Sequence, residues 1–523
     1  MAEQQYVVGL DNGTTGVKAK IYDLEGNIIS EGYREYECVY PRPGWVDQDV
    51  NMLMEANYEA LRDVVARSGV APNDLASMGL STQRALHLYV DEDGKLLRDN
   101  MGISWQDARC GEQVRWMREA IGDDAYYDVT GLPLSTIWAS PKIKWVMDNE
   151  PDTFERADKI LTTQEYFLRN LGARDGWFQD RSNGSLYGLM DIKSFEWSGE
   201  LCDTFGVPME KLPDLVPSAY QVGAIDEYCH ERTGLPVGMP ICTGGGDQQC
   251  AAIGAGVIEE GLCEVTLGTA GVSICHLDSP RYDPHKKITC SAHAFPAPGK
   301  WIAEGLQAAA ASSYRWFRDN VGYMARFIED FTGDEAYEVI NKMAAAVPPG
   351  SKGLLFHPYL AGSVSPNYDP QARSSFLGMT FAHDTSTMAR AVMEGVAFES
   401  RDILQAFANM GVDIREVRIS GGSTKSPVWS QIQADVYGRP TVALKEGECT
   451  VIGAAILGAV GAGVFSSVEE GCAEMVNRTA TYEPDMETHA VYDELYEVFK
   501  GTYQALAEGG VYDKLAGFQS RHG

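Results

Sequence analysis

The sequence is poor in basic residues and lacks motifs that would mark several other classes of protein. Lys and Arg number 43 against 74 Asp and Glu, so the formal net charge is −31. This excess disfavours nucleic acid or an anionic membrane as partner, although it leaves room for a local cationic pocket that binds a nucleotide. The eleven cysteines include no Cys-x-x-Cys pair, and the nine histidines form no His-Glu-x-x-His motif. We therefore expect reduced core thiols in a cytoplasmic protein.

Long hydrophobic runs are also missing. The longest uncharged apolar run, residues 451–465, is short for a membrane span, and its Gly and Ala content is typical of a closely packed buried helix. The N-terminus is polar and lacks the basic and apolar regions of a signal peptide. A chain of 523 residues is too long for one ordinary core. We expect two domains, residues 1–255 and 256–523.

A turn rich in glycine and threonine, Asp11-Asn12-Gly13-Thr14-Thr15-Gly16, follows an apolar run and precedes an alternating one. The pattern predicts strand, tight turn, strand. Gly13 and Gly16 let backbone N–H groups approach an anion closely, and the hydroxyls of Thr14 and Thr15 add donors. Asp11, at the end of the first strand, can hold a divalent cation or its waters. An ordinary β-turn would account for the glycines but needs none of the Asp, Thr, Thr set.

A second copy of this turn occurs about half a chain length later. Gly268-Thr269-Ala270-Gly271-Val272 shares four of five residues with Gly13-Thr14-Thr15-Gly16-Val17. A phosphate-type loop that recurs at half-length predicts a duplicated α/β fold, in which the two loops face each other across a cleft.

Several segments, in order along nearly the whole chain, resemble the FGGY family of carbohydrate kinases. They are residues 11–18, 141–145, 244–247, 266–272, 390–398 and 420–423. Each motif alone is weak, but the ordered set is specific. The resemblance implies two duplicated actin-like ATPase (ribonuclease H-like) domains around a central cleft. It also implies that ATP and Mg²⁺ bind in this cleft and that a sugar or polyol hydroxyl is phosphorylated.

The resemblance assigns roles to the loops and to Asp247. Asp247 would be the catalytic base, and the three glycines before it would let a substrate approach, although it could also merely cap the following helix. Asp11 and Asp247 would bind the metal. The glycine pair at 421–422 would let the flat adenosine approach the backbone. ATP binding is expected at Gly13, Thr14, Thr15, Gly268, Thr269, Gly421, Gly422 and Ser423.

The predicted acceptor site mixes features of two branches of the family. Arg84 matches a substrate-binding arginine of glycerol kinase, but Ala85 replaces the glutamate that follows it there, and Ile137 replaces a tyrosine. Trp105 matches a tryptophan that packs against substrate carbons, although core packing would equally explain it. The residues expected to contact the acceptor are Gln83, Arg84, Trp105, Asp247 and Gln248.

The C-terminal half, at 347–362 and 420–429, resembles xylulokinase and autoinducer-2 kinase. Because two glycerol-gripping side chains are missing, we do not expect glycerol to be the preferred substrate. The resemblance of the C-terminal half implies a ketose such as xylulose or a related pentulose as acceptor. The alternatives are a glycerol- or erythritol-type polyol kinase, an autoinducer-2-like kinase, a sugar sensor without transferase activity or, in another class, an actin-like ATPase without a sugar substrate. The expected partners are a small sugar or polyol and, in a homodimer, a second copy of the chain.

Overall fold

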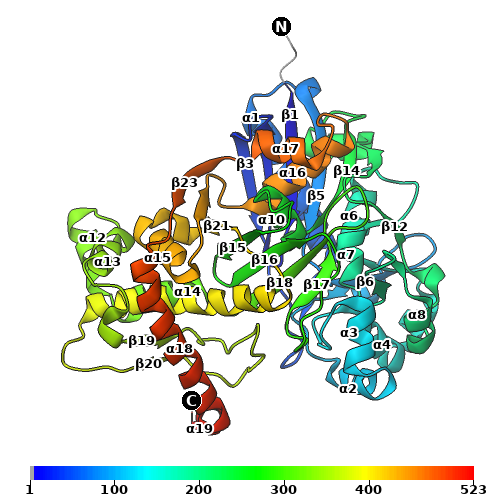
Figure 1. Cartoon of the computed structure of the whole chain (residues 1–523). Coiled ribbons are helices and arrows are strands. Elements are labelled where there is room, and N and C mark those ends of the chain that lie inside the picture. The colour runs from blue at the N-terminus through cyan, green and yellow to red at the C-terminus, as the bar shows by residue number, and fades with distance from the viewer. Residues whose placement is uncertain (1–4, 523) are drawn as a thin grey trace.

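The computed structural model describes residues 5–522 and has two mixed β-sheets at its centre (Figure 1). The first sheet has the strand order β13-β14-β5-β1-β2-β3. In it β1, β2 and β3 pair antiparallel, β5 and β14 extend the sheet in parallel with β1, and β13 closes the edge antiparallel. The bounds are β1 (Tyr6–Asn12), β2 (Gly16–Asp23), β3 (Ile28–Glu35), β5 (Leu75–Thr82), β13 (Gln221–Ala224) and β14 (Pro240–Gly246).

The second sheet repeats this plan. Its order is β17-β18-β16-β15-β21-β22-β23, with β15, β16 and β18 antiparallel, β21 and β22 parallel to β15, and β23 antiparallel at the edge. The bounds are β15 (Leu262–Leu267), β16 (Gly271–Leu277), β17 (Thr289–Ala292), β18 (Trp301–Gln307), β21 (Glu416–Gly421), β22 (Thr441–Leu444) and β23 (Arg478–Tyr482). The shared order confirms the predicted duplication of an α/β unit.

In each half one long helix precedes the strand that pairs parallel with the first strand of the sheet. The helix is α1 (Val50–Ser68) before β5 and α14 (Thr385–Asn409) before β21. The side chain of Asp49 accepts hydrogen bonds from two backbone N–H groups of the first turn of α1, and Gly69 ends the helix with φ 67°. Apolar residues at helical spacing, among them Leu53, Ala60 and Leu61, are fully buried. Both helices thus cover a face of their own sheet.

Two short helices, α10 (Asp247–Gly254) and α16 (Cys449–Gly461), follow the last parallel strand of each half and cross each other closely. A Cβ at Gly254 would lie 1.9 Å from the Cys449 carbonyl oxygen, and one at Gly453 would lie 1.8 Å from that of Cys250. Only glycine permits this approach. In Figure 1, α16 also lies beside β1 and β5, so a helix of the second half covers the first sheet. The predicted boundary after residue 255 stays a prediction.

A lobe of small elements flanks the first sheet and is drawn in cyan in Figure 1. It contains a four-stranded sheet of β4 (Asp47–Asp49), β7 (Met101–Ile103), β6 (His87–Val90) and β8 (Lys159–Thr162). The helices from this lobe to the end of the first half are α2 (Gly111–Ala120), α3 (Asp123–Thr130), α4 (Ala139–Asn149), α5 (Pro151–Arg156), α6 (Thr163–Leu171), α7 (Arg181–Ser185), α8 (Gly199–Phe205) and α9 (Glu227–Thr233).

The second half carries further helices outside its sheet. They are α11 (Ala311–Asn320), α12 (Met324–Thr332), α13 (Ala336–Ala345), α15 (Pro427–Tyr437), α17 (Val468–Met475), α18 (Met486–Glu508) and α19 (Val511–His522). Within residues 5–522, no helix is both long and apolar enough to cross a membrane. All eleven cysteines are free thiols, and all but Cys38 are buried, as expected for core thiols.

Candidate active site

The first predicted loop joins β1 to β2. The Gly13 N–H donates to the Gly16 carbonyl over 3.0 Å, and the Gln48 side chain donates to the Thr14 carbonyl over 2.7 Å. The Thr14 hydroxyl accepts a hydrogen bond from the indole of Trp105 at 2.9 Å. Thr15 is exposed. The loop is therefore anchored at Thr14, while Thr15 stays accessible to an anion.

The second loop joins β15 to β16 in the same way. The Gly268 N–H donates to the Ala270 carbonyl at 3.0 Å, and the Thr269 carbonyl accepts from Ala310 N–H and from the Ser312 hydroxyl near the start of α11. Thr269 and Ala270 are exposed. The loop is thus anchored through its backbone, and the Thr269 hydroxyl is left accessible.

The predicted adenosine segment lies next to the second loop. Leu267, at the end of β15, pairs in register with Gly421, at the end of β21. Gly421 has φ 83°, and a Cβ there would lie 2.7 Å from the Leu267 carbonyl oxygen, whereas a Cβ at Gly422 would meet nothing within 4 Å. Ser423 is buried, and its hydroxyl has no hydrogen-bond partner in the described part of the chain. The structure therefore brings the predicted residues Gly268, Thr269, Gly421 and Gly422 to one edge of the second sheet.

The position two residues before the first glycine of each loop carries a carboxylate in the first half only. Asp11 on β1 pairs in register with Ser81 on β5, and the Ser81 hydroxyl donates to its carboxylate at 2.8 Å. At the matching place in the second half, Thr266 pairs with Ser420, and their hydroxyls lie 2.7 Å apart. Burial raises the pKa of Asp11 to about 7, and the negative charge of Asp247 adds to the rise.

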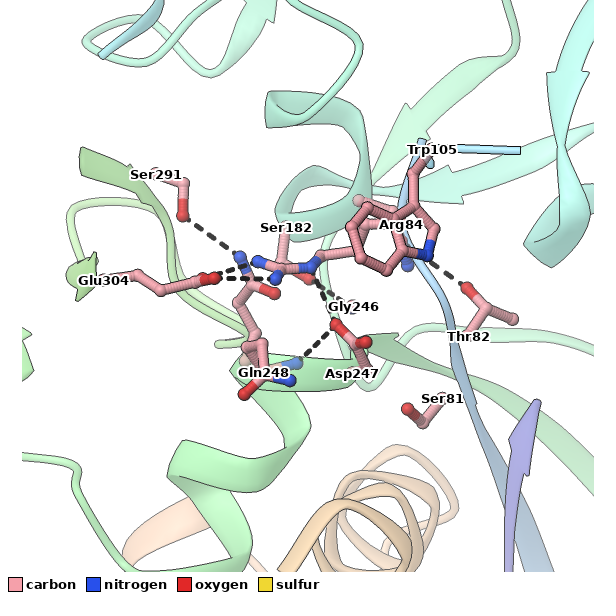
Figure 2. A network of polar contacts seen from close by, with 12 residues as sticks. Ser81, Thr82, Arg84, Trp105, Ser182, Gly246, Asp247, Gln248, Ser291 and Glu304 are labelled. Carbon is pink, nitrogen blue, oxygen red and sulfur yellow. Dashed lines mark hydrogen bonds and ion pairs between the residues drawn. The ribbon is translucent and has the colours of Figure 1, made fainter. Parts of the chain in front are cut away.

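Asp247, the first residue of α10, forms an ion pair with Arg84, which follows β5 (Figure 2). Arg84 Nε lies 2.7 Å from Asp247 Oδ1, and the Gln248 N–H donates to the same oxygen at 2.8 Å. The two terminal nitrogens of Arg84 donate to the carboxylate of Glu304, on β18 of the second sheet, over 2.6 and 2.8 Å. Arg84 therefore connects a carboxylate of each half of the molecule.

The charges around Asp247 shift its pKa in opposite directions. Burial raises the pKa of Asp247, the guanidinium of Arg84 counteracts that rise, and the negative charge of Glu304 adds to it. The Asp247 side chain keeps 28% of its surface exposed, so a substrate can reach it. Both of its hydrogen-bonding contacts within residues 5–522 use Oδ1, so Oδ2 has no partner in this part of the chain.

A cavity of about 240 Å³ lies beside these three residues. Both halves of the chain line it, and its wall is mostly apolar with a few polar groups. Ala85 and Ile137 lie in the wall, where the sequence departs from glycerol kinase. The lining residues are Arg84, Ala85, Trp105, Ile137, Trp138, Leu186, Asp247, Gln248, Ala270, Val272, Thr289, Glu304, Leu306, Val364, Ser365 and Tyr368.

Of the residues predicted to contact the acceptor, Arg84, Trp105, Asp247 and Gln248 line this cavity. Gln83 does not line it, since its side chain is fully buried and donates to Gln48 at 3.0 Å. Gln83 therefore supports the first loop through Gln48, which holds Thr14.

The sequence reasoning missed Glu304, together with the polar lining residues Thr289, Ser365 and Tyr368. Glu304 carries one usable signal, because it is the only charged residue in the otherwise apolar strand from Trp301 to Leu306. Thr289, Ser365 and Tyr368 do not stand out in this way from the residues around them.

The carboxylates of Asp11 and Asp247 fit a magnesium ion that also binds phosphate. No cluster of three or more His, Cys, Asp or Glu suited to a metal occurs in residues 5–522. Mg²⁺ does not need one, because it commonly binds through one or two carboxylates together with substrate phosphates and water. Asp11 and Asp247 supply hard oxygen ligands and influence each other electrostatically.

The duplicated sheets, the paired loops and the carboxylate at the cavity are parts that an ATP-dependent phosphotransferase needs. Residues 6–254 match the N-terminal domain, and residues 263–462 the C-terminal domain, of the FGGY family of carbohydrate kinases. The chain belongs to this family.

Relatives of two named activities match the chain equally well. The xylulose kinase of Bacillus subtilis (strain 168) is 29% identical over 95% of this chain and 97% of that protein. The glycerol kinase of Deinococcus radiodurans is 29% identical over 93% and 94%. A solved structure of a gluconate kinase from Lactobacillus acidophilus superposes with a TM-score of 0.87 at 24% identity, over 98% of this chain and 100% of that one. The last comparison shows the fold alone.

Proposed function

We propose that this kinase phosphorylates a terminal hydroxyl of a neutral ketose, with xylulose or a related pentulose as the first candidate. The observation that carries the proposal is the Asp247–Arg84–Glu304 chain of ion pairs at the wall of a small cavity. Xylulose kinases among the relatives support a pentulose, but glycerol kinases match at the same identity. The choice of acceptor therefore depends on the cavity.

The charges in the cavity wall favour an uncharged acceptor. Arg84 is the one cationic residue among the lining residues, and it is already paired with both Asp247 and Glu304. The three side chains together carry a net negative charge. A sugar acid would bring another carboxylate next to them, and like charges in a partly buried site repel strongly. We therefore place aldonates such as gluconate below neutral sugars.

Two wall positions argue against glycerol as the preferred acceptor. Ala85 and Ile137 present only apolar side chains to the cavity, and a site discriminates strongly through the groups that bind each hydroxyl. A four-carbon polyol such as erythritol is the second candidate. A cavity of about 240 Å³ is smaller than the ~300–1,000 Å³ of common ligand pockets, which suits one small acceptor rather than a nucleotide.

In the proposed mechanism Asp247 is the general base. Arg84 and the Gln248 N–H hold its Oδ1, so that Oδ2 accepts the proton of the attacking hydroxyl. That hydroxyl oxygen bonds to the γ-phosphorus of ATP while the bond from this phosphorus to the leaving ADP oxygen breaks. Thr14, Thr15 and Thr269 would donate to the phosphates, and Gly421, Gly422 and Ser423 would lie against the adenosine. Mg²⁺, held by Asp11 and Asp247, would neutralise phosphate charge.

A coupled ADP-release assay tests the acceptor. We expect xylulose or another pentulose to give the highest kcat/KM, erythritol and glycerol lower values, and gluconate turnover at the background of ATP hydrolysis. Gluconate as the best substrate would refute the charge argument. No acceptor above background would refute the proposed function. Size-exclusion chromatography with light scattering tests the predicted homodimer separately.

A further inference from the structure

Lys142, in the segment 141–145 singled out from the sequence, has no part in the chemistry described so far. It lies in the first turn of α4, and none of its surface is exposed. Burying an ammonium ion is costly unless its donors are satisfied, and the positive end of a helix adds to the cost. The burial lowers the pKa of Lys142 to about 7. An apolar side chain of similar length would avoid this cost, so the cation must serve a purpose.

The hydrogen bonds of Lys142 show what this purpose is. Nζ donates to the carbonyl of Ile137 at 2.7 Å and to those of Trp105 and Trp138 at 3.4 Å each. When it is protonated the amine has three donors, and here it meets three carbonyl oxygens. All three acceptor residues line the cavity beside Asp247. Nζ forms no ion pair with a carboxylate of residues 5–522, and nearby Asp107 pairs with Arg109.

These carbonyls belong to two separate segments of the chain that line the cavity. Ile137 and Trp138 immediately precede α4. Hydrogen bonds to these two carbonyls alone would therefore stabilise only the start of that helix. Trp105 comes from the segment after β7, and its indole donates to the Thr14 hydroxyl of the first loop. A lysine that bonds to both segments fixes their position relative to each other.

We propose that Lys142 is a positioning residue of the acceptor site, which joins the backbone at Trp105 to the backbone at Ile137 and Trp138 and so holds these lining side chains in place. The inference rests on the proposed function, since it takes this cavity to be the acceptor site. It predicts that Lys142 governs the binding of the sugar more than the transfer step, because its Nζ contacts neither Asp247 nor the loop residues directly.

The test compares Lys142→Met with Lys144→Met on the same helix. Lys144 pairs with Asp148 and does not line the cavity, so it is a matched loss of one lysine. For Lys142→Met we expect the KM for the sugar to rise about tenfold, the size of one or two lost hydrogen bonds, with kcat changed less than about threefold. The KM for ATP should stay within about twofold of wild type. Lys144→Met should resemble wild type in all three.

Lys142→Arg, which keeps a cation with several donors, should recover part of the lost affinity for the sugar. Thermal unfolding establishes whether each variant is folded. A folded Lys142→Met enzyme with an unchanged sugar KM overturns the proposal, and so does an equal fall of kcat alone. If neither variant folds, Lys142 supports the fold rather than the site, and the proposal is likewise refuted. A wild-type enzyme that phosphorylates no sugar instead refutes the proposed function, and this inference with it.

Discussion

Arg84 and Glu304 form a two-pronged ion pair, with N···O distances of 2.6 and 2.8 Å, between residues that stand on different halves of the molecule. The same guanidinium holds Asp247 through Nε. The pair therefore has two effects, since it joins the two sheets across the cavity and shares the charge of Arg84 between two carboxylates. A substitution of Glu304 should therefore also affect Asp247.

Glu304→Gln should shift the pH dependence of the reaction. The negative charge of Glu304 raises the pKa of Asp247, and Arg84 lowers it. Without that charge, Arg84 acts on Asp247 alone, and the pKa of Asp247 falls. Because a general base works when deprotonated, the acidic limb of the kcat/KM profile should move to lower pH. The maximum of kcat/KM should fall about tenfold or more, as one prong of the interdomain pair weakens. An acidic limb displaced to higher pH would contradict the argument.

Asp247→Asn tests the base directly and preserves the shape of the side chain. Loss of a general base costs roughly 10²- to 10⁴-fold, and we expect kcat to fall within or beyond that range. Binding of ATP, measured by equilibrium titration, should remain, because both phosphate loops stay in place. The paired control is Asp128→Asn, in α3 and outside the cavity, which should behave as wild type. Residual turnover above a tenth of wild type would show that another group accepts the proton.

The sequence predicted the parts of the site that depend on local patterns. The two loops, the helix that begins at Asp247 and the buried glycine-rich helix α16 are all found near their expected bounds. Their signals are turn residues, strand ends and apolar spacing, which act over a few residues. Asp247 sits at the start of its helix, but Gly246 is the cap, so the capping alternative does not explain the aspartate.

The parts that could not be predicted depend on contacts between distant segments. Glu304 lies 220 residues from Arg84, and only the assembled second sheet brings it to the cavity. Gln83 shows the converse case, because it was predicted to contact the acceptor but does not line the cavity. It stands next to Arg84 in the sequence, yet consecutive residues at a strand end point to different sides, and Gln83 turns to Gln48 instead. Proximity in the chain therefore predicted several residues that line the cavity but did not decide which side chains face it.

Gly421 and Gly422 offer a matched pair of substitutions by alanine. At Gly421 the backbone is in the left-handed region and a Cβ would crowd the Leu267 carbonyl, so Gly421→Ala should destabilise the protein by about 1–2 kcal/mol. At Gly422 a Cβ meets nothing within 4 Å, so Gly422→Ala should keep the wild-type melting temperature. If the adenosine lies against this glycine, Gly422→Ala should still raise the KM for ATP severalfold. An unchanged KM would move the adenosine site elsewhere.

Glu264 should make the stability of the second sheet depend on pH. It is fully buried on β15, its Oε1 accepts from the hydroxyls of Thr266 and Ser420, and its Oε2 has no partner in residues 5–522. Burial raises its pKa from 4.5 to about 7. Between these two values the folded state binds more protons than the unfolded state, so this group's contribution to stability is full below pH 4.5 and is lost as pH rises through 7.

Glu264→Gln keeps an oxygen acceptor for both hydroxyls and removes the titration. Its melting temperature, relative to wild type, should therefore increase as the pH is raised from 5 to 8, by an amount that corresponds to a few kcal/mol at most. Asp128→Asn, at an exposed carboxylate in α3, is a control without burial. A difference between Glu264→Gln and wild type that stays constant over this range would mean that Glu264 does not change its charge there. Its unpaired oxygen would then need another explanation, such as a bound water.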